Sequence, residues 1–173
     1  MKRSILVSLC LILYTSEMIG QEAAYLNKVD SVDNLIDTLY GVISGEKNEA
    51  RDWELFRFLF TPEAKLIPSV KNKDGVYEVR YMSPENYIES AGKWFMENGF
   101  YEKELFRKTE SFGNITHIFS TYESFKSKTD TKPFMRGINS IQLLNDGERW
   151  WIVNIYWTQE TDNNPIPQSY LPH

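Results

Sequence analysis

The fold is decided by three apolar segments near the C-terminus: NITHIFSTYESF at 114–125, FMRGINSIQLL at 134–144 and RWWIVNIYW at 149–157. Each segment is rich in β-branched and aromatic residues, which favour extended strands. Asn145-Asp146-Gly147, between the last two, is typical of a tight turn. The three segments therefore predict an antiparallel meander.

The chain ahead of this meander carries both helix and strand signals. Apolar residues at helical spacing predict helices, and short β-rich runs bounded by turn residues predict strands. We predict helices at 30–44, 51–60 and 83–99, and strands at 65–70, 76–81 and 101–112. Helices grouped ahead of an antiparallel sheet indicate an α+β fold.

The composition is that of one globular domain. The chain has 173 residues, of which 42% are hydrophobic and 25% charged, with a net charge of −5. An acidic chain without a basic run is not typical of nucleic-acid binding or of binding to anionic lipid.

Residues 1–20 are predicted to be a secretory signal peptide. Lys2 and Arg3 form its charged start, and the apolar run 5–13 is too short to span a bilayer. The alternative is a buried N-terminal helix. Cleavage near Gly20 would remove Cys10, the only cysteine, and leave a short leader at 21–29 on a secreted or periplasmic protein.

The turns predict how the meander strands pair. A two-residue loop at Asp146-Gly147 would pair Asn145 with Glu148 and place Ser140 opposite Val153. A symmetric pairing across the longer loop at 126–133 places Glu123 beside Arg136 and His117 beside Gln142. These registers divide the side chains between two faces.

One face mixes polar groups with large apolar ones, which is typical of a ligand pocket. It carries His117, Phe119, Thr121, Glu123, Arg136, Ile138, Ser140, Gln142, Trp151, Val153, Ile155 and Trp157. The opposite face carries Ile118, Tyr122, Met135, Asn139, Ile141, Leu143, Trp150, Ile152, Asn154 and Tyr156. Helices can cover only one apolar face, so we predict a homodimer through the second face. The alternative is that the C-terminal tail folds back over it.

The order of elements, together with LFTPEAKL at 59–66 and GERWWIVNIYWTQE at 147–160, resembles the nuclear transport factor 2-like (NTF2-like) superfamily. This is the fold shared by ketosteroid isomerases and SnoaL-like cyclases. RDWELFRFLF, STYES and RGINSIQL are similar to an uncharacterised bacterial branch. The resemblance covers 30–160 and implies a cone-shaped, curved antiparallel sheet wrapped around three helices, followed by an irregular tail at 161–173.

The resemblance also implies which face lines the cavity. In ketosteroid isomerases the tryptophan-bearing last strand does so, which would place Val153, Ile155 and Trp157 in the wall. Those enzymes carry one acid at the end of the first strand and another on the penultimate strand. Here the corresponding stretches are 67–69, with Ile-Pro-Ser, and 138–142, with no acid. Isomerase chemistry is therefore not implied. The predicted ligand-binding residues are Trp53, Arg57, Trp94, Phe119, Ser140, Gln142, Trp151, Val153, Ile155 and Trp157.

Three residues are candidates for catalysis. His117 could act as a general acid or base, or be a hydrogen-bonded structural residue. Glu123 and Arg136 could orient a polar ligand, Glu123 could act as a base, or the two could form an ion pair.

Arg57, one of the predicted ligand-binding residues, needs Glu123 as a partner if it is buried, or could meet an anionic ligand at the cavity mouth.

The sequence contains no metal-binding spacing and no cofactor motif, so we expect no metal and no cofactor. Three functions stay open at this point. The first is binding of a small, largely apolar ligand with a polar end. The second is a dehydratase, cyclase or isomerase that uses His117 with Glu123 and Arg136. The third is a structural dimerisation module whose cavity is filled by its own side chains.

Overall fold

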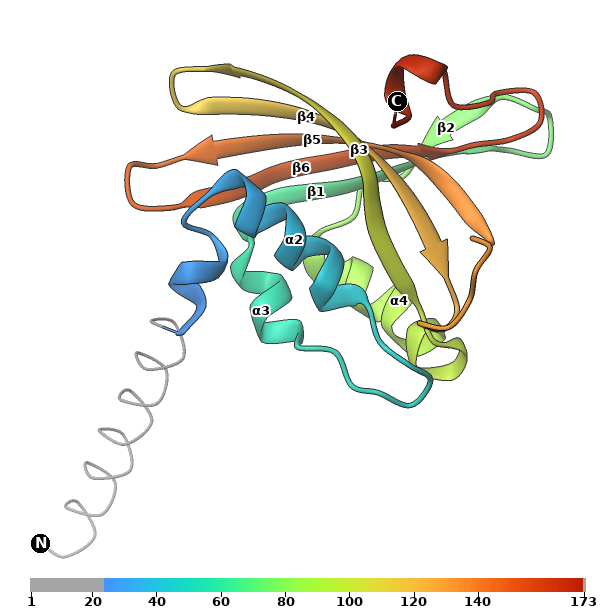
Figure 1. Ribbon diagram of the computed structural model, residues 1–173, viewed down its shortest axis with the longest axis horizontal. Helices are drawn as coiled ribbons and strands as arrows, with labels where there is room; N and C mark the ends of the chain where they lie inside the picture. The colour runs from blue at the N-terminus through green and yellow to red at the C-terminus, as the bar shows by residue number, and fades with distance from the viewer. Residues whose placement is uncertain (1–23, 173) are drawn as a thin grey trace, which may run out of the picture.

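A curved sheet of six strands lies over three helices, which pack against one of its two faces (Figure 1). The computed structural model describes residues 24–172, so the predicted signal peptide lies outside the described residues. Within this range, no helix combines the length and apolar character needed to cross a membrane. The predicted α+β fold with a curved, mostly antiparallel sheet is confirmed.

The helices are α2 (Val32–Ile43), α3 (Trp53–Phe58) and α4 (Pro84–Asn98). Each begins after a capping side chain that accepts a backbone N–H of the first turn. The acceptors are Ser31, Asp52 and Ser83. Ser83 and Asn86 form a reciprocal capping box, with Pro84 at the first helical position.

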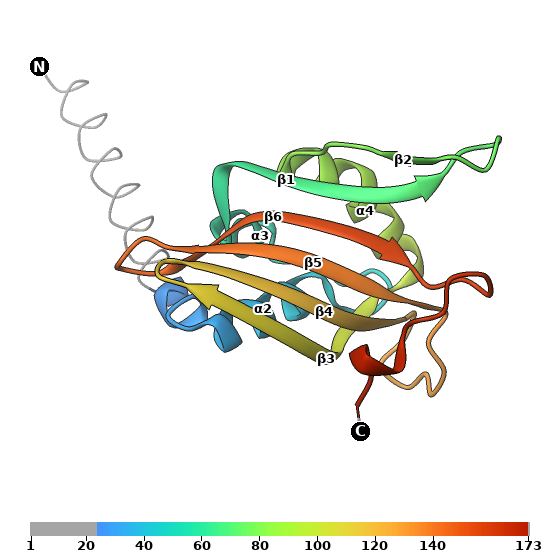
Figure 2. The same ribbon diagram turned by 90° about the horizontal axis from the view of Figure 1, so that it is seen from above.

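The strands are β1 (Phe60–Lys71), β2 (Tyr77–Val79), β3 (Tyr101–Phe112), β4 (Ile115–Phe125), β5 (Met135–Asn145) and β6 (Trp150–Gln159). Their order in the sheet is β2-β1-β6-β5-β4-β3 (Figure 2). β1 is parallel to β6, and the other pairs are antiparallel. α3 is shorter than the helix predicted at 51–60, and β1 is longer than the strand predicted at 65–70. The reason is that Phe60 already pairs with Ile152 of β6.

The pairing of β4 with β5 is confirmed: Glu123 lies opposite Arg136, and His117 lies opposite Gln142. The predicted pairing of β5 with β6 is wrong. Asn145 pairs with Trp150, so the connecting loop has four residues. The Asp146 carboxylate shapes this loop, because it accepts hydrogen bonds from the backbone N–H groups of Glu148 at 2.9 Å and Arg149 at 2.8 Å.

A second irregularity lies within β6. The register shifts between Gln142 and Leu143, so Val153 has no direct partner and forms a bulge. Together the loop and the bulge place Ser140 opposite Tyr156 instead of Val153. A slip by an odd number of residues moves side chains to the other face of a sheet. Ile155 and Trp157 therefore share a face with Ile141 and Asn139, and not with His117.

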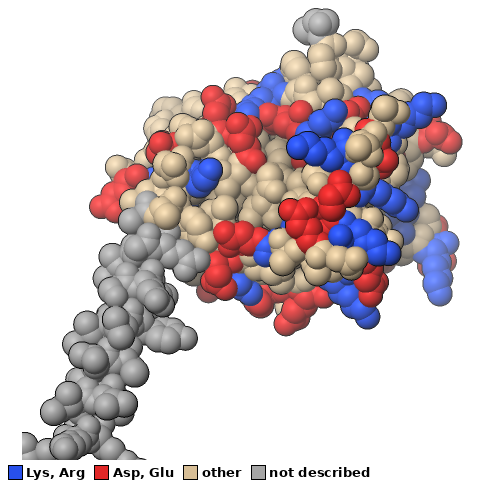
Figure 3. Space-filling model, turned by 60° about the horizontal axis from the view of Figure 1, so that its bottom comes forward, with Lys and Arg blue, Asp and Glu red and all other residues tan. Residues whose placement is uncertain are grey.

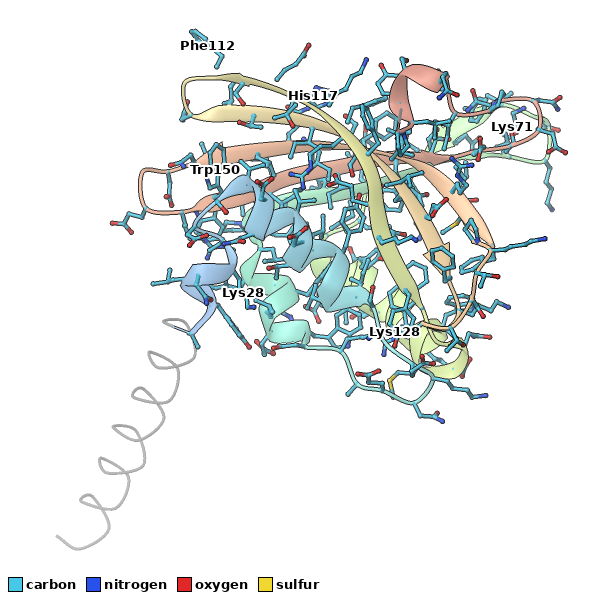
Figure 4. The ribbon with its side chains drawn as sticks, viewed as in Figure 1. Lys28, Lys71, Phe112, His117, Lys128 and Trp150 are labelled. Atoms are coloured by element: carbon cyan, nitrogen blue, oxygen red, sulfur yellow. The ribbon has the colours of Figure 1, made fainter. Side chains whose placement is uncertain are left out.

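The helices cover the face that carries Ile118, Ile141 and Ile152, each of which is 0% exposed. We call this the concave face and the opposite one the convex face. The predicted dimer surface was thus assigned to the wrong side of the sheet, because these residues form the core with α2 and α3. Figure 4 shows His117 on the convex face, away from the helices.

The C-terminal segment 161–172 folds back onto the convex face, which was the alternative to a partner subunit. Thr121 Oγ1 donates to the Tyr170 carbonyl at 2.7 Å, and the Tyr170 ring packs on Phe119 with centroids 5.1 Å apart. The segment covers only part of this face. Phe112, Ile115 and Tyr156 stay exposed.

Candidate functional site

A cavity of about 330 Å³ lies between the helices and the concave face. More than half of its lining residues are aromatic. The wall consists of Leu39, Tyr40, Ile43, Phe56, Leu66, Tyr87, Ala91, Trp94, Phe95, Phe100, Glu102, Tyr122, Phe134, Met135, Asn139, Ile155 and Trp157. A cavity of this size is not filled by its own side chains, which disfavours the structural module with a filled cavity.

The cavity reaches the surface between α4 and the start of β5. Trp94 is 38% exposed and Phe134 46% exposed, and both rings line the cavity with centroids 6.1 Å apart. On the helix side of the molecule, shown in Figure 3, acidic and basic side chains are interspersed. The mouth of the cavity is thus formed by aromatic rings. The described surface on this side carries no large patch of a single charge (Figure 3).

Among the described residues that line the cavity, Glu102 is the one that carries a carboxyl group. It is the second residue of β3, where the backbone N–H donates to Ser44 Oγ at the end of α2 at 3.0 Å. Its carboxyl group accepts hydrogen bonds from Ser124 Oγ at 2.9 Å and from the Asn139 amide. Burial raises the pKa of Glu102 to about 7, and the two hydrogen bonds oppose this shift.

A chain of hydrogen bonds runs behind Asn139 on the concave face. The Asn139 amide donates to the Tyr40 hydroxyl at 3.1 Å, and that hydroxyl lies 2.7 Å from Ser120 Oγ. Ser120 in turn donates to Glu104, which accepts from Arg107 at 2.7 Å. Because every member has a partner, this network fixes Asn139 beside Glu102.

The tyrosines around Glu102 remain neutral hydroxyl groups over the ordinary pH range. Burial, reinforced by the nearby Glu102 carboxyl, raises the pKa values of Tyr40, Tyr87 and Tyr122. Glu102 is therefore the one lining residue of the described chain that can change charge near neutral pH.

The structure brings three predicted ligand-binding residues into the cavity wall: Trp94, Ile155 and Trp157. Trp53 lies outside the wall, where it stacks on Phe95 with centroids 6.5 Å apart and supports the helix pair α3 and α4. Trp94 comes from α4, and Ile155 and Trp157 come from β6.

Arg57 was expected to pair with Glu123 if buried, or to meet an anionic ligand at the cavity mouth. The structure places it with other partners, outside the cavity wall. It lies at the surface, where Glu85 of α4 and Glu54 each bind its guanidinium group at 2.8 Å. Hydrogen bonding to Glu85 raises the pKa of Arg57 and lowers that of Glu85. The ion pair links α3 to the start of α4.

The catalytic candidates lie on the convex face and do not converge. His117 Nε2 lies 3.0 Å from Ser140 Oγ. Arg136 Nε lies 3.7 Å from Glu123 and 3.5 Å from Glu160. His117 and Glu123 lie six positions apart on β4, which is about 20 Å along the strand. A mechanism that uses both on one small substrate is therefore wrong.

The remaining predicted binding residues are also outside the cavity. Phe119 and Ser140 line a separate hollow of about 460 Å³ on the convex face, beneath the C-terminal segment. Gln142 and Val153 lie on the sheet outside both hollows. Trp151 donates to Asp146 at 2.6 Å and packs on Arg149. The bulge in β6 explains why Ser140 and Gln142 lie on the face opposite Ile155 and Trp157.

Sequence reasoning missed Glu102, Tyr40 and Asn139. A signal for Glu102 existed, since Glu102 and Glu104 alternate along a strand and face Ser120 and Ser124 of β4. Small hydroxyl residues opposite two acids on a buried face indicate a polar site. The assignment of the concave face to the wrong side concealed it.

No family model matches this sequence, and no curated protein matches it. Solved structures do match its fold. An NTF2-like protein of unknown function from Silicibacter pomeroyi has 16% identity and a TM-score of 0.52, and the match covers 84% of this chain and 98% of that one. For an NTF2-like protein of unknown function from Pseudomonas putida the identity is 7% and the TM-score 0.57, with 82% and 94% covered.

A third similar structure is a candidate ketosteroid isomerase from Parabacteroides distasonis. It is 8% identical to this chain with a TM-score of 0.52, and the match covers 79% of this chain and 98% of that one. Identities this low concern the fold and not the chemistry of the site.

Proposed function

We propose that this chain, which has the NTF2-like fold, binds one small and mostly apolar molecule whose polar end lies against Glu102. The observation that supports this most strongly is a partly buried carboxyl group, hydrogen-bonded to Ser124, in the wall of a mostly apolar, aromatic cavity. Apolar walls supply binding free energy, and a few placed polar groups fix the orientation of the ligand. Asn139 and Ser124 hold the carboxyl group in place.

A second candidate function is acid–base catalysis on the bound molecule. It is favoured by the raised pKa of Glu102, because a group that titrates near pH 7 can both accept and donate a proton. Glu102 then takes the role that the sequence had suggested for His117 and Glu123. Incubation of candidate molecules with the protein separates the two functions: recovery of unchanged ligand supports binding, and conversion supports catalysis.

Filling the cavity tests the binding function. Ala91 lines the cavity on α4, and a tryptophan at this position would place an indole ring inside it. We expect Ala91→Trp to weaken binding of the small neutral dye prodan at least about tenfold, because the dye and the indole need the same volume. Fluorescence titration measures this affinity.

The matched control is Ala50→Trp, because Ala50 is exposed in the loop before α3. This variant should bind prodan like the wild type. Native mass spectrometry of protein taken directly from cells provides a second readout, since a retained small molecule should be lost in Ala91→Trp and kept in Ala50→Trp. Equal binding by all three proteins would contradict the proposal.

We also propose that the protein is exported and forms homodimers. The charged start and short apolar run of residues 1–20 support export. The exposed Phe112, Ile115 and Tyr156 on the convex face support self-association there. Mass spectrometry of the protein from its native host should show a chain shortened near Gly20, and sedimentation should give twice its mass. An intact N-terminus or a stable monomer would contradict the respective proposal.

A further inference from the structure

We propose that the molecule bound in the cavity is an organic cation, either an amine or a quaternary ammonium compound, whose positive group lies against the Glu102 carboxylate and the surrounding rings. This inference rests on the proposed function and specifies its ligand class.

Glu102 carries the only formal charge among the lining residues, and that charge is negative. No lysine or arginine of the described chain forms an ion pair with it; its hydrogen-bond donors are Ser124 and Asn139, both neutral. A buried carboxylate without a counter-ion is unfavourable. A bound cation would supply the missing positive charge.

Glu104, two residues further along β3, provides an internal comparison. It also faces the concave side, but Arg107 donates to it at 2.7 Å and Arg107 also binds Asp33 of α2 at 2.8 Å. The chain thus neutralises Glu104 with its own guanidinium group and leaves Glu102 without one. The difference marks Glu102 as the place where a positive group of a ligand fits.

The wall suits the rest of such a cation. Tyr87, Trp94 and Phe100 line the cavity together with further rings. The faces of aromatic rings attract ammonium groups, most strongly where water is excluded, and apolar rings also accommodate alkyl and aryl substituents. An anionic ligand would be repelled by Glu102, and a neutral ligand would leave the carboxyl group protonated.

The groups that face Glu102 leave it as the titrating residue. They are Tyr40 from α2, Tyr87 from α4, Tyr122 and Ser124 from β4, Asn139 from β5 and Glu104 on β3 itself. The tyrosines stay protonated because burial raises their pKa values, and Glu104 is paired with Arg107. Binding of a permanent cation should therefore follow the ionisation of Glu102.

The test uses phenethyltrimethylammonium, which is charged at every pH, and its neutral isostere with carbon in place of nitrogen. Displacement of prodan measures the affinity of each for the full chain. We expect the cation to bind about thirtyfold more tightly at about pH 8.5 than at about pH 5.5, because Glu102 titrates near 7. The neutral isostere should change less than about threefold over this range.

Two variants complete the experiment. Glu102→Gln should weaken the cation at least about tenfold at high pH and leave the neutral isostere unaffected. Ser124→Ala keeps the carboxyl group but removes a hydrogen bond to its charged form, so the pH midpoint of cation binding should move upward. This second variant gives an answer even if Glu102→Gln does not fold.

Each outcome has a distinct meaning. If both molecules bind, both are lost in Ala91→Trp, and the cation shows no preference for high pH or for Glu102, the cavity binds ligands but the cation proposal is wrong. If neither molecule displaces prodan, or if prodan binds equally to Ala91→Trp, the proposed function itself fails. Tighter binding of the neutral isostere at low pH would assign the cavity to neutral ligands and overturn the inference.

Discussion

Glu102→Gln should make the ligand-free protein more stable than the wild type at pH 8. In the folded wild type, burial raises the pKa of this carboxyl group from 4.5 to about 7. The folded state therefore holds a proton between these values that the unfolded chain releases. The stability that depends on the protonated group is complete below about pH 4.5 and is lost as the pH rises through about 7.

The size of this loss follows from the shift of the pKa. Each pKa unit corresponds to about 1.4 kcal/mol, so the wild type should lose about 3 kcal/mol between pH 4.5 and pH 8 through Glu102 alone. Glutamine cannot ionise, and its carbonyl oxygen can still accept the hydrogen bond from Ser124. Its extra N–H donors need partners at every pH, which costs about 1 kcal/mol, so we expect a net gain of about 2 kcal/mol at pH 8 and a loss of about 1 kcal/mol at pH 4.

Urea denaturation of refolded, ligand-free protein at several pH values measures this difference. Glu110→Gln is the matched control, because Glu110 is an exposed carboxylate on the same strand. The free energy of unfolding of this control should follow that of the wild type at every pH. A constant difference between Glu102→Gln and the wild type from pH 4 to pH 8 would show that Glu102 does not titrate as described.

Much of the fold follows from local signals in the sequence. Ser31, Asp52 and Ser83 mark the starts of the helices because a short polar side chain can accept the unpaired N–H groups of the first turn. The pairing of β4 with β5 also follows, since both strands run without interruption on either side of a polar loop. These features depend on residues close together in the chain.

The residues of the site were harder to predict, because the pairing register of β5 with β6 decides which face of the sheet each β6 side chain lies on. Asp146-Gly147 is compatible with a two-residue loop. In the structure the Asp146 carboxylate accepts the backbone N–H groups of Glu148 and Arg149, and the loop has four residues. The bulge at Val153 then exchanges the faces of β6, and no local residue preference signals it. Trp157 and Ile155 were therefore predicted for the right cavity but with the wrong neighbours, and His117 was placed inside instead of outside.

The aromatic content was informative only after the faces were known. Trp94 and Trp157 line the cavity, whereas Trp53 and Trp151 support neighbouring elements through Phe95 and Arg149. The same side chain can thus fill a core or form a wall. The buried acid was the more specific signal, since a carboxyl group placed on the apolar face of a strand is unfavourable unless a function requires it.

Arg51→Ala should cause a large loss of stability, although Arg51 lies outside the cavity. Arg51 is only 7% exposed, and its guanidinium group lies against the end of α2. Nε donates to the Ile43 carbonyl at 3.0 Å and Nη2 to the Gly45 carbonyl at 2.6 Å, while Nη1 donates to the carbonyls of Glu46 and Glu49. The Ile43 carbonyl lies in the last turn of α2, where carbonyls lack intrahelical donors. The carbonyls of Gly45 and Glu46 each also accept one backbone N–H group, so Arg51 adds a charged donor to them.

The same cluster connects α2 to the strand that carries Glu102. Gly45 and Phe100 exchange backbone hydrogen bonds of 2.7 and 3.0 Å, and Phe100 lines the cavity two residues ahead of Glu102. The Arg51 guanidinium group lies directly against Gly45 and leaves no room there for a β-carbon. Loss of Arg51 should therefore loosen the start of β3 as well as the end of α2.

We expect Arg51→Ala to lower the free energy of unfolding by about 3 kcal/mol, because several buried carbonyl groups lose charge-assisted partners at once. Arg51→Lys should recover about half of this loss, since an ammonium group keeps the charge but cannot reach carbonyls on several sides as the planar guanidinium does. The exposed Arg80 supplies the control, and Arg80→Ala should change stability by less than about 0.5 kcal/mol. Urea denaturation at one pH gives all three values. If Arg51→Ala and Arg80→Ala destabilise equally, or if lysine fully replaces Arg51, the guanidinium cluster does not hold α2 and β3 together as described.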